Sequence, residues 1–155
     1  MSFFNAMNVS ATGLTAQRLR MDVISENIAN VNTTRTQEGG PFQRKHVLFQ
    51  EITETPFTAL FRNVFDGEGP HTHRGIGQGY GVRVESIVRD QTEGPMIFDP
   101  GHPDADAEGY VRLPNINIVE EMVHMISASR SYEANITALN TTKGMLSRTL
   151  DITRQ

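Results

Sequence analysis

Apolar residues recur at seven-residue spacing near both ends of the chain. Near the N-terminus the row consists of Met7, Leu14, Met21 and Ile28. Near the C-terminus two rows interleave: Ile118, Met125, Tyr132, Leu139 and Leu146 form one, and Met122, Ser129, Ile136, Lys143 and Leu150 form the other. Eight of these ten C-terminal positions are apolar. Such a narrow seam predicts a helix that packs lengthwise on another helix. An amphipathic helix packed on its own domain is the alternative for each end.

Proline and glycine separate the two ends from the middle of the chain. All seven prolines and eleven of the thirteen glycines lie within 39–114. Because both residues oppose long helices, we expect helices over 1–35 and 114–155, with pairing to each other and to other copies. Asn115 or Asn117 is expected to cap the second helix, since asparagine side chains accept hydrogen bonds from the first backbone N–H groups.

The middle, 36–113, is expected to form a small β-rich domain. Short runs of β-forming residues, separated by turn formers, predict strands within 42–52, 80–90, 96–98 and 110–113. A segment at about 53–81 combines helix-like apolar spacing, at Phe57, Leu60, Phe61, Val64 and Phe65, with a glycine-rich end. The predicted fold class is therefore α+β, with two long terminal helices flanking a β-rich middle.

Asparagines lie beside the apolar seams, where a buried amide destabilises the fold unless it meets a partner. Asn27 and Asn30 share a helix face next to Ile28, and Asn135 recurs in the second helix. We expect Asn27 and Asn30 to select one alignment with a neighbouring segment, as polar residues do in coiled coils. The first helix is expected to end from Asn32 onward.

Composition narrows the possible functions. The net charge is −4, with the acidic excess in the middle, which argues against nucleic-acid binding, since that function needs a basic patch. No cysteine is present, which excludes disulfides and thiolate zinc sites. No apolar run is long enough for a transmembrane helix, and the N-terminus does not resemble a Sec signal peptide.

Histidines and aspartates in the middle segment offer the best candidate for enzyme chemistry. The side chains of this set have the spacing of possible metal ligands: His71, His73, His102, Asp104 and Asp106. All of them lie in loops rich in proline and glycine, without a supporting catalytic motif, so we interpret the aspartates as turn caps. We therefore expect no catalytic residue, no bound metal, no cofactor and no small-molecule substrate.

Two segments resemble bacterial flagellar axial proteins. The segment 11-ATGLTAQRLRMDVISENIANVNTTRT-36 is similar to the N-terminal signature of that family. The segment 109-GYVRLPNINIVEEMVHMISASRSYEANITALNTTKGMLSRTLDI-152, with the loop that begins at 98, resembles the proximal-rod subunits of the flagellar basal body. The resemblance covers about 1–52 and 82–155. The segment at about 53–81 is unmatched, and we interpret it as a floppy insert rather than an outer elaboration.

The resemblance implies a structural subunit whose terminal helices build the inner tube of the rod. It implies export through the flagellar type III apparatus and assembly in the periplasm. Its implied partners are copies of itself, other rod proteins and the junction protein that links the rod to the membrane ring. The implied packing residues include Asn27, Asn30, Asn32, Thr33, Glu121, Met122, Arg130, Tyr132 and Asn135.

Two alternatives to a rod subunit stay open on the sequence alone. A soluble coiled-coil adaptor or export-related binding module would share the heptad rows. A metal-dependent hydrolase would use His71, His73, His102 and Asp104. For a rod subunit, we expect loosely ordered ends that gain helix on assembly, since the middle is too small to cover both apolar stripes.

Overall fold

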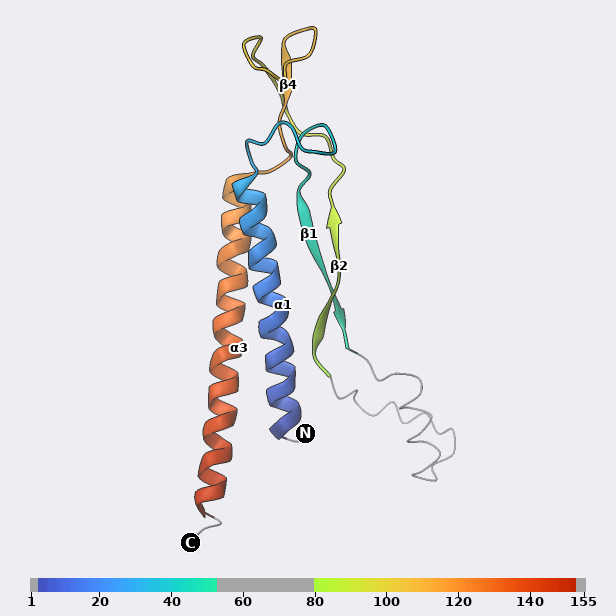
Figure 1. Ribbon diagram of the computed structural model, residues 1–155. Helices are drawn as coiled ribbons and strands as arrows, with labels where there is room; N and C mark the ends of the chain where they lie inside the picture. Colours follow the sequence, from blue (N-terminus) through green and yellow to red (C-terminus); the bar gives the residue numbers. More distant parts are fainter. Residues whose placement is uncertain (1–2, 53–79, 153–155) are drawn as a thin grey trace, which may run out of the picture.

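A computed structural model describes residues 3–52 and 80–152 (Figure 1). Its elements are α1 (Phe3–Ala29), β1 (Lys45–Glu51), β2 (Val82–Arg89), β3 (Met96–Phe98), β4 (Tyr110–Arg112) and α3 (Ile118–Ile152). The predicted α+β class and the four predicted strand segments are confirmed. Most of the expected insert lies outside the described residues, including its five apolar residues and His71 and His73.

The two helices lie side by side and run in opposite directions (Figure 1). At about 1.5 Å per residue, α1 is roughly 40 Å long and α3 roughly 52 Å long. The far end of α3 therefore extends past the start of α1 (Figure 1). No helix in the described ranges is long and apolar enough to cross a membrane.

Asparagine side chains form hydrogen bonds with backbone groups at the end of α1 and at the start of α3. The Asn117 Oδ1 atom accepts a hydrogen bond from the Val119 backbone N–H at 3.0 Å, as expected for an N-cap. α1 ends at Ala29, three residues before Asn32, where the sequence placed its end. The Asn30 Nδ2 atom donates to the Glu26 carbonyl at 2.9 Å, so this amide stabilises the last turn.

Strands β1 and β2 form an antiparallel pair that lies along α1, on the side away from α3 (Figure 1). The pairing runs from Lys45–Arg89 to Glu51–Val82, with a shift in register between Leu48 and Phe49. Next to β2, Gly81 has φ +112°, and an added Cβ would lie 2.1 Å from the Thr12 Oγ1 atom of α1. Only glycine combines this backbone conformation with so close an approach.

Strands β3 and β4 form a second antiparallel pair beyond the ends of the helices (Figure 1). The Phe98 and Tyr110 rings pack edge to face across this pair, with centroids 5.3 Å apart. The Thr34 hydroxyl donates to Asp104 Oδ2 at 2.7 Å, which joins the segment after α1 to the loop between the two strands. This hairpin is therefore anchored to the helix pair through its loop.

The apolar core of the described chain is small. Its buried apolar residues are Ala16, Val23, Ile24, Val111 and Ala128. Much larger apolar side chains are exposed, including many on α3. Since a soluble monomer rarely leaves a continuous apolar helix face in water, this distribution indicates a surface for association.

Candidate functional site at the interface of the two helices

The predicted heptad rows lie on different sides of the helix pair. The row of α1 is half-buried throughout, at Met7, Leu14, Met21 and Ile28. In the first row of α3 only Ile118 is exposed, and the half-buried members are Met125, Tyr132, Leu139 and Leu146. In the other row Ser129 is half-buried, and Met122, Ile136, Lys143 and Leu150 are exposed. The row that completes the contact with α1 instead lies one residue earlier, at Glu121, Ala128, Asn135 and Thr142. The apolar row that starts at Met122 therefore does not face α1.

Small residues explain this offset, because they let the two backbones come close. An added Cβ on Gly13 of α1 would lie 3.0 Å from Asn135 Oδ1 and 3.2 Å from its Cγ atom. The Asn135 Nδ2 atom donates to the Ser131 carbonyl of its own helix at 2.8 Å, so its polar tip is held in place. Ala128, seven residues before Asn135, is completely buried.

Two contacts fix the same antiparallel register. Asn27 meets Glu121, and Gly13 meets Asn135. Each member of the second contact is fourteen residues from its counterpart in the first, along its own helix. Fourteen residues are two heptads, so the two contacts lie on one seam.

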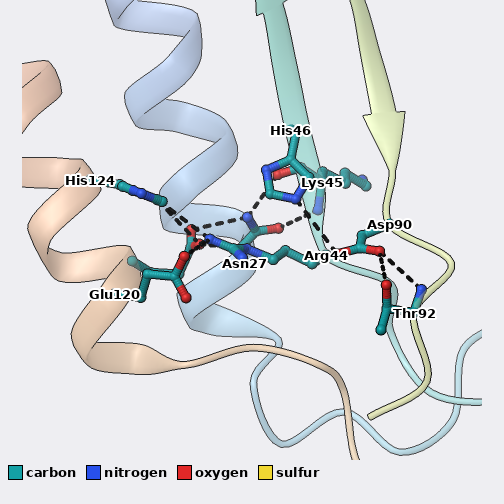
Figure 2. A network of polar contacts seen from close by, with 9 residues as sticks. Asn27, Arg44, Lys45, His46, Asp90, Thr92, Glu120 and His124 are labelled. Atoms are coloured by element: carbon teal, nitrogen blue, oxygen red, sulfur yellow. Dashed lines mark hydrogen bonds and ion pairs between the residues drawn. The ribbon is translucent and has the colours of Figure 1, made fainter.

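The Asn27 amide joins three segments of the chain (Figure 2). Its Oδ1 atom accepts from the Lys45 backbone N–H, and its Nδ2 atom donates to the Lys45 carbonyl, both at 2.9 Å. The Nδ2 atom also donates to Glu121 Oε2 at 3.1 Å. Asn27 is 1% exposed and Glu121 is 1% exposed. α1, the start of β1 and the start of α3 are therefore held together by buried polar contacts.

Arg44, next to β1, neutralises the buried carboxylate of Glu121. Its Nε atom donates to Glu121 Oε1 at 2.7 Å, and its Nη2 atom lies 2.5 Å from the same oxygen. The Nη2 atom also reaches Glu120 at 3.3 Å and His124 Nδ1 at 3.4 Å. Burial acts to lower the pKa of Arg44, but the hydrogen bonds and charges of Glu121 and Glu120 together outweigh it and raise that pKa.

Weaker ion pairs at the surface surround this buried cluster. The Lys45 Nζ atom is paired with Glu26 Oε1 and lies 5.5 Å from the centroid of the Phe42 ring. His46 Nε2 lies 3.8 Å from Asp90 Oδ2, and Figure 2 shows the two side chains facing each other. Hydrogen bonds from the Thr92 hydroxyl and backbone lower the pKa of Asp90, and His46 adds to this effect. Exposed pairs of this kind contribute little stability compared with the buried cluster.

The remaining predicted residues lie apart from this cluster. Asn30 stabilises the end of α1 and accepts a hydrogen bond from Thr33 Oγ1 at 3.1 Å. Asn32 and Arg130 are exposed. Sequence reasoning did not assign Arg44 to a site, and only the family resemblance implied Glu121 as a packing residue, without naming its partner. The available signal was the acidic residue itself, on a seam of mostly apolar positions. A charge that is buried there needs a partner, which the sequence should have prompted us to look for.

The loop between β3 and β4 shows the predicted turn chemistry. Asp99 Oδ1 accepts from the Gly101 N–H at 3.1 Å, and Asp106 Oδ1 accepts from Glu108 and Tyr110. His102 Nδ1 accepts from the Asp104 N–H at 3.1 Å. Among the residues that the structure describes, no three His, Asp or Glu side chains come together as a metal site.

Two family models match the parts of the chain that form the helix pair. Residues 7–36 match the model described as "Flagella basal body rod protein". Residues 107–152 match the model described as "Flagellar basal body rod FlgEFG protein C-terminal". These ranges contain most of α1 and all of α3, so the two matched segments meet at the polar cluster.

Curated relatives match over nearly the whole chain. "Flagellar basal-body rod protein FlgC" of Borreliella burgdorferi is 49% identical, with 98% of each chain covered. The protein of the same name from Bacillus subtilis is 45% identical, covering 98% of this chain and 99% of its own. The one from Escherichia coli O157:H7 is 36% identical, with 98% of each chain covered. The chain therefore belongs to the FlgC family of flagellar basal-body rod proteins.

Proposed function

We propose that this chain is a structural subunit of the bacterial flagellar basal-body rod, and that it polymerises through its two terminal helices. The observation that carries this proposal is the apolar surface of α3 that faces away from α1 while the core of the single chain stays small. A subunit that is completed by its neighbours would show this distribution. In the rod, the packed helices would form the wall of a hollow shaft and transmit torque along it.

The three-part division proposed from the sequence fits this role. Residues 1–35 and 114–155 would supply the axial helices, and 36–113 would lie outside them with the segment at about 53–81. The buried cluster of Asn27, Arg44 and Glu121 supports the division, because it ties both helices to the first strand of the middle. A load on one helix would thus reach the other through short, hydrogen-bonded contacts.

The rod role needs neither catalysis nor a cofactor. Neighbours in the rod would be copies of this chain, other rod proteins and, at the base, the junction protein to the membrane ring. The chain would reach this place through the flagellar type III apparatus without a cleaved signal peptide. Nothing in the relatives or in the geometry favours the alternative of a soluble coiled-coil adaptor.

A deletion and rescue experiment tests this function. A flagellated bacterium that lacks its own copy of the gene should be non-motile and should regain motility with this chain. An epitope-tagged chain should purify with basal bodies rather than stay in the cytosolic fraction. A tagged chain that restores motility but is found only in the cytosol would favour the adaptor over the rod subunit.

A further inference from the structure

Two side chains of α1 hold the β1–β2 pair at its two ends. Asn27 bonds both backbone groups of Lys45, the first residue of β1, at 2.9 Å. The Thr12 Oγ1 atom accepts a hydrogen bond from the N–H of Val82, the first residue of β2, at 3.3 Å. Because the strands are antiparallel, these two first residues lie at opposite ends of the pair (Figure 1). We call the contact between Thr12 and Val82 the latch.

The length of the strands fits the distance between these two anchors. Asn27 and Thr12 are fifteen residues apart on α1, or about 22 Å at 1.5 Å per residue. Seven strand steps separate Val82 from Arg89, which pairs with Lys45, or about 23 Å at roughly 3.3 Å per residue. The pair can therefore lie along α1 with both anchors formed at once and without slack.

The anchors, rather than apolar packing, keep the strand pair on the helix. Every residue of β1 and β2 is half-buried or exposed. Phe49 and Ile87, two of their larger apolar side chains, are 37% and 46% exposed. Few buried apolar contacts and exposed backbone hydrogen bonds are typical of segments that open locally. The behaviour of the pair therefore depends on the strength of each anchor.

The two anchors differ in strength. The Asn27 amide is 1% exposed and also bonds Glu121, whose carboxylate binds Arg44 next to β1 (Figure 2). The latch is a single hydrogen bond, longer than the usual distance of about 2.9–3.0 Å. The Thr12 hydroxyl donates its proton to the Val9 carbonyl at 2.7 Å, so it offers the strand only an acceptor. The latch should therefore open more often than the anchor at Asn27.

A β-bulge between the two anchors provides a bending point. Leu48 pairs with Ser86 and Phe49 pairs with Val84, so Glu85 is an extra residue of β2. A bulge of this kind interrupts the ladder and bends its strand. It divides the pair into a fixed half on the side of Asn27, 45–48 with 86–89, and a free half on the side of the latch, 49–51 with 82–84.

The two strands of the free half are also joined to each other. The Arg83 Nε atom of β2 donates to Gln50 Oε1 of β1 at 2.9 Å. The Ile52 N–H donates to the Gly81 carbonyl at 3.0 Å, just beyond the last strand pair. Neither bond involves α1, so both persist when the latch opens. The free half therefore moves as one unit.

We propose that the β1–β2 pair is a hinged strap, whose free half swings away from α1 about the bulge at Glu85 when the latch between Thr12 and Val82 opens. The fixed half stays on Asn27. Opening uncovers the side of α1 around Thr12, while Gly13 keeps α1 on α3. One helix pair therefore supports two shapes of the chain. The strap is independent of the proposed function, because all of its contacts lie within one chain.

Amide hydrogen exchange of the isolated chain, followed by NMR, tests whether the latch opens by itself. After correction for intrinsic rates, the Val82 amide should exchange at least tenfold faster than those of Ile52 and Asp90, which are bonded at the free and fixed ends of the pair. Equal protection of all three amides would overturn the strap. Equal loss of protection at Val82 and Ile52 would also overturn it, because the strands would then fray instead of moving together.

Distances between spin labels test the hinge, and labels attach only at introduced cysteines because the chain has none. Arg18→Cys with Glu51→Cys spans the free half, and Arg18→Cys with Val88→Cys spans the fixed half. All three positions are exposed. Thr12→Val removes the acceptor of the latch but keeps the shape of the side chain. It should increase the population with a longer distance between 18 and 51 at least tenfold and leave the distance between 18 and 88 unchanged.

Thr15→Val is the matched control, since Thr15 is exposed on the same helix and its hydroxyl bonds the Ala11 carbonyl at 3.1 Å. It should change neither distance, and Thr12→Ser, which keeps the hydroxyl, should behave like the unmodified chain. An unchanged distance between 18 and 51 in Thr12→Val, or an equal lengthening of both distances, would overturn the hinge. If Thr12→Val does not fold, the exchange rates of the unmodified chain decide the question alone.

Discussion

The Asn27 amide on α1 donates to the Glu121 carboxylate on α3 at 3.1 Å, between two side chains that are each 1% exposed. The same amide pairs with both backbone groups of Lys45. A one-residue slip of either helix would leave these buried polar groups without partners. The contact therefore selects a single alignment of the three segments, at a cost for any other alignment of about 1–3 kcal/mol per unpaired group.

Glu121→Ala should destabilise the isolated chain by about 1–3 kcal/mol, because the buried Asn27 amide and the half-buried Arg44 would both lose this carboxylate partner. Chemical denaturation followed by circular dichroism would measure this loss. Glu120→Ala is the matched control, with an expected change below about 1 kcal/mol, since its carboxylate is half exposed. The double variant Arg44→Met/Glu121→Leu should be more stable than Glu121→Ala. Equal effects of Glu120→Ala and Glu121→Ala would contradict this account of the cluster.

Gly13→Ala should not stabilise α1, although alanine is a better helix former than glycine by about 1 kcal/mol. The new methyl group would meet the Asn135 side chain at 3.0 Å and displace it from its hydrogen bond with Ser131. In an Asn135→Ala background the same substitution should add roughly 1 kcal/mol of stability. Gly144→Ala is a control with an expected gain of similar size, because no heavy atom lies within 4 Å of the new Cβ. A gain for Gly13→Ala in the unmodified chain would show that the helices are further apart.

Gly81→Ala should destabilise the chain by about 2 kcal/mol or more. The φ angle of +112° disfavours any side chain, and the added Cβ would lie 2.1 Å from Thr12 Oγ1. Thr12→Ala should restore only part of the loss, since the backbone strain remains. Thermal unfolding of these variants, with Gly101→Ala as an unstrained control, would separate the two contributions. Full recovery by Thr12→Ala would mean that the backbone conformation contributes nothing.

Met122→Asp and Leu139→Asp should have different effects on the stability of the single chain, although both should abolish or reduce motility. Met122 is exposed in the single chain, so its substitution should leave the free energy of unfolding within about 0.5 kcal/mol. Motility should nevertheless be lost, because the charge would be buried against a neighbouring subunit. Leu139→Asp should reduce both stability and motility, since Leu139 is half-buried beside α1. Normal swimming with Met122→Asp would argue against a subunit contact on that face.

Local sequence signals were sufficient for the secondary structure. The concentration of proline and glycine in 39–114 predicted where helices could form, and alternation predicted β2. The sequence offered both Asn115 and Asn117 as the N-cap of α3, and Asn117 makes the capping hydrogen bond. Only the local geometry of the chain decides between the two. The end of α1 came earlier than expected, since the Asn30 amide stabilises the helix terminus at Ala29.

Long-range contacts were beyond the reach of the same signals. A heptad pattern ranks positions by apolar character, which favoured the row that starts at Met122. Packing instead placed the row of Glu121 and Ala128 against α1, because small residues allow close approach and Arg44 neutralises the acid. Neither Arg44 nor the backbone of Lys45 could be linked to Asn27 from spacing, since 17 and 18 residues of chain separate them. Whether the residues of the Met122 row pack in the rod stays a prediction.

A density map of intact basal bodies at side-chain detail tests the central claim most directly. The claim is that the apolar surface of α3 that faces away from α1, exposed in the single chain, is covered in the rod. The account predicts that Met122 and Ile126 are buried against a helix of a neighbouring subunit while Asn27 keeps its contact with Glu121. A map in which both apolar residues face the solvent or the open channel would contradict it.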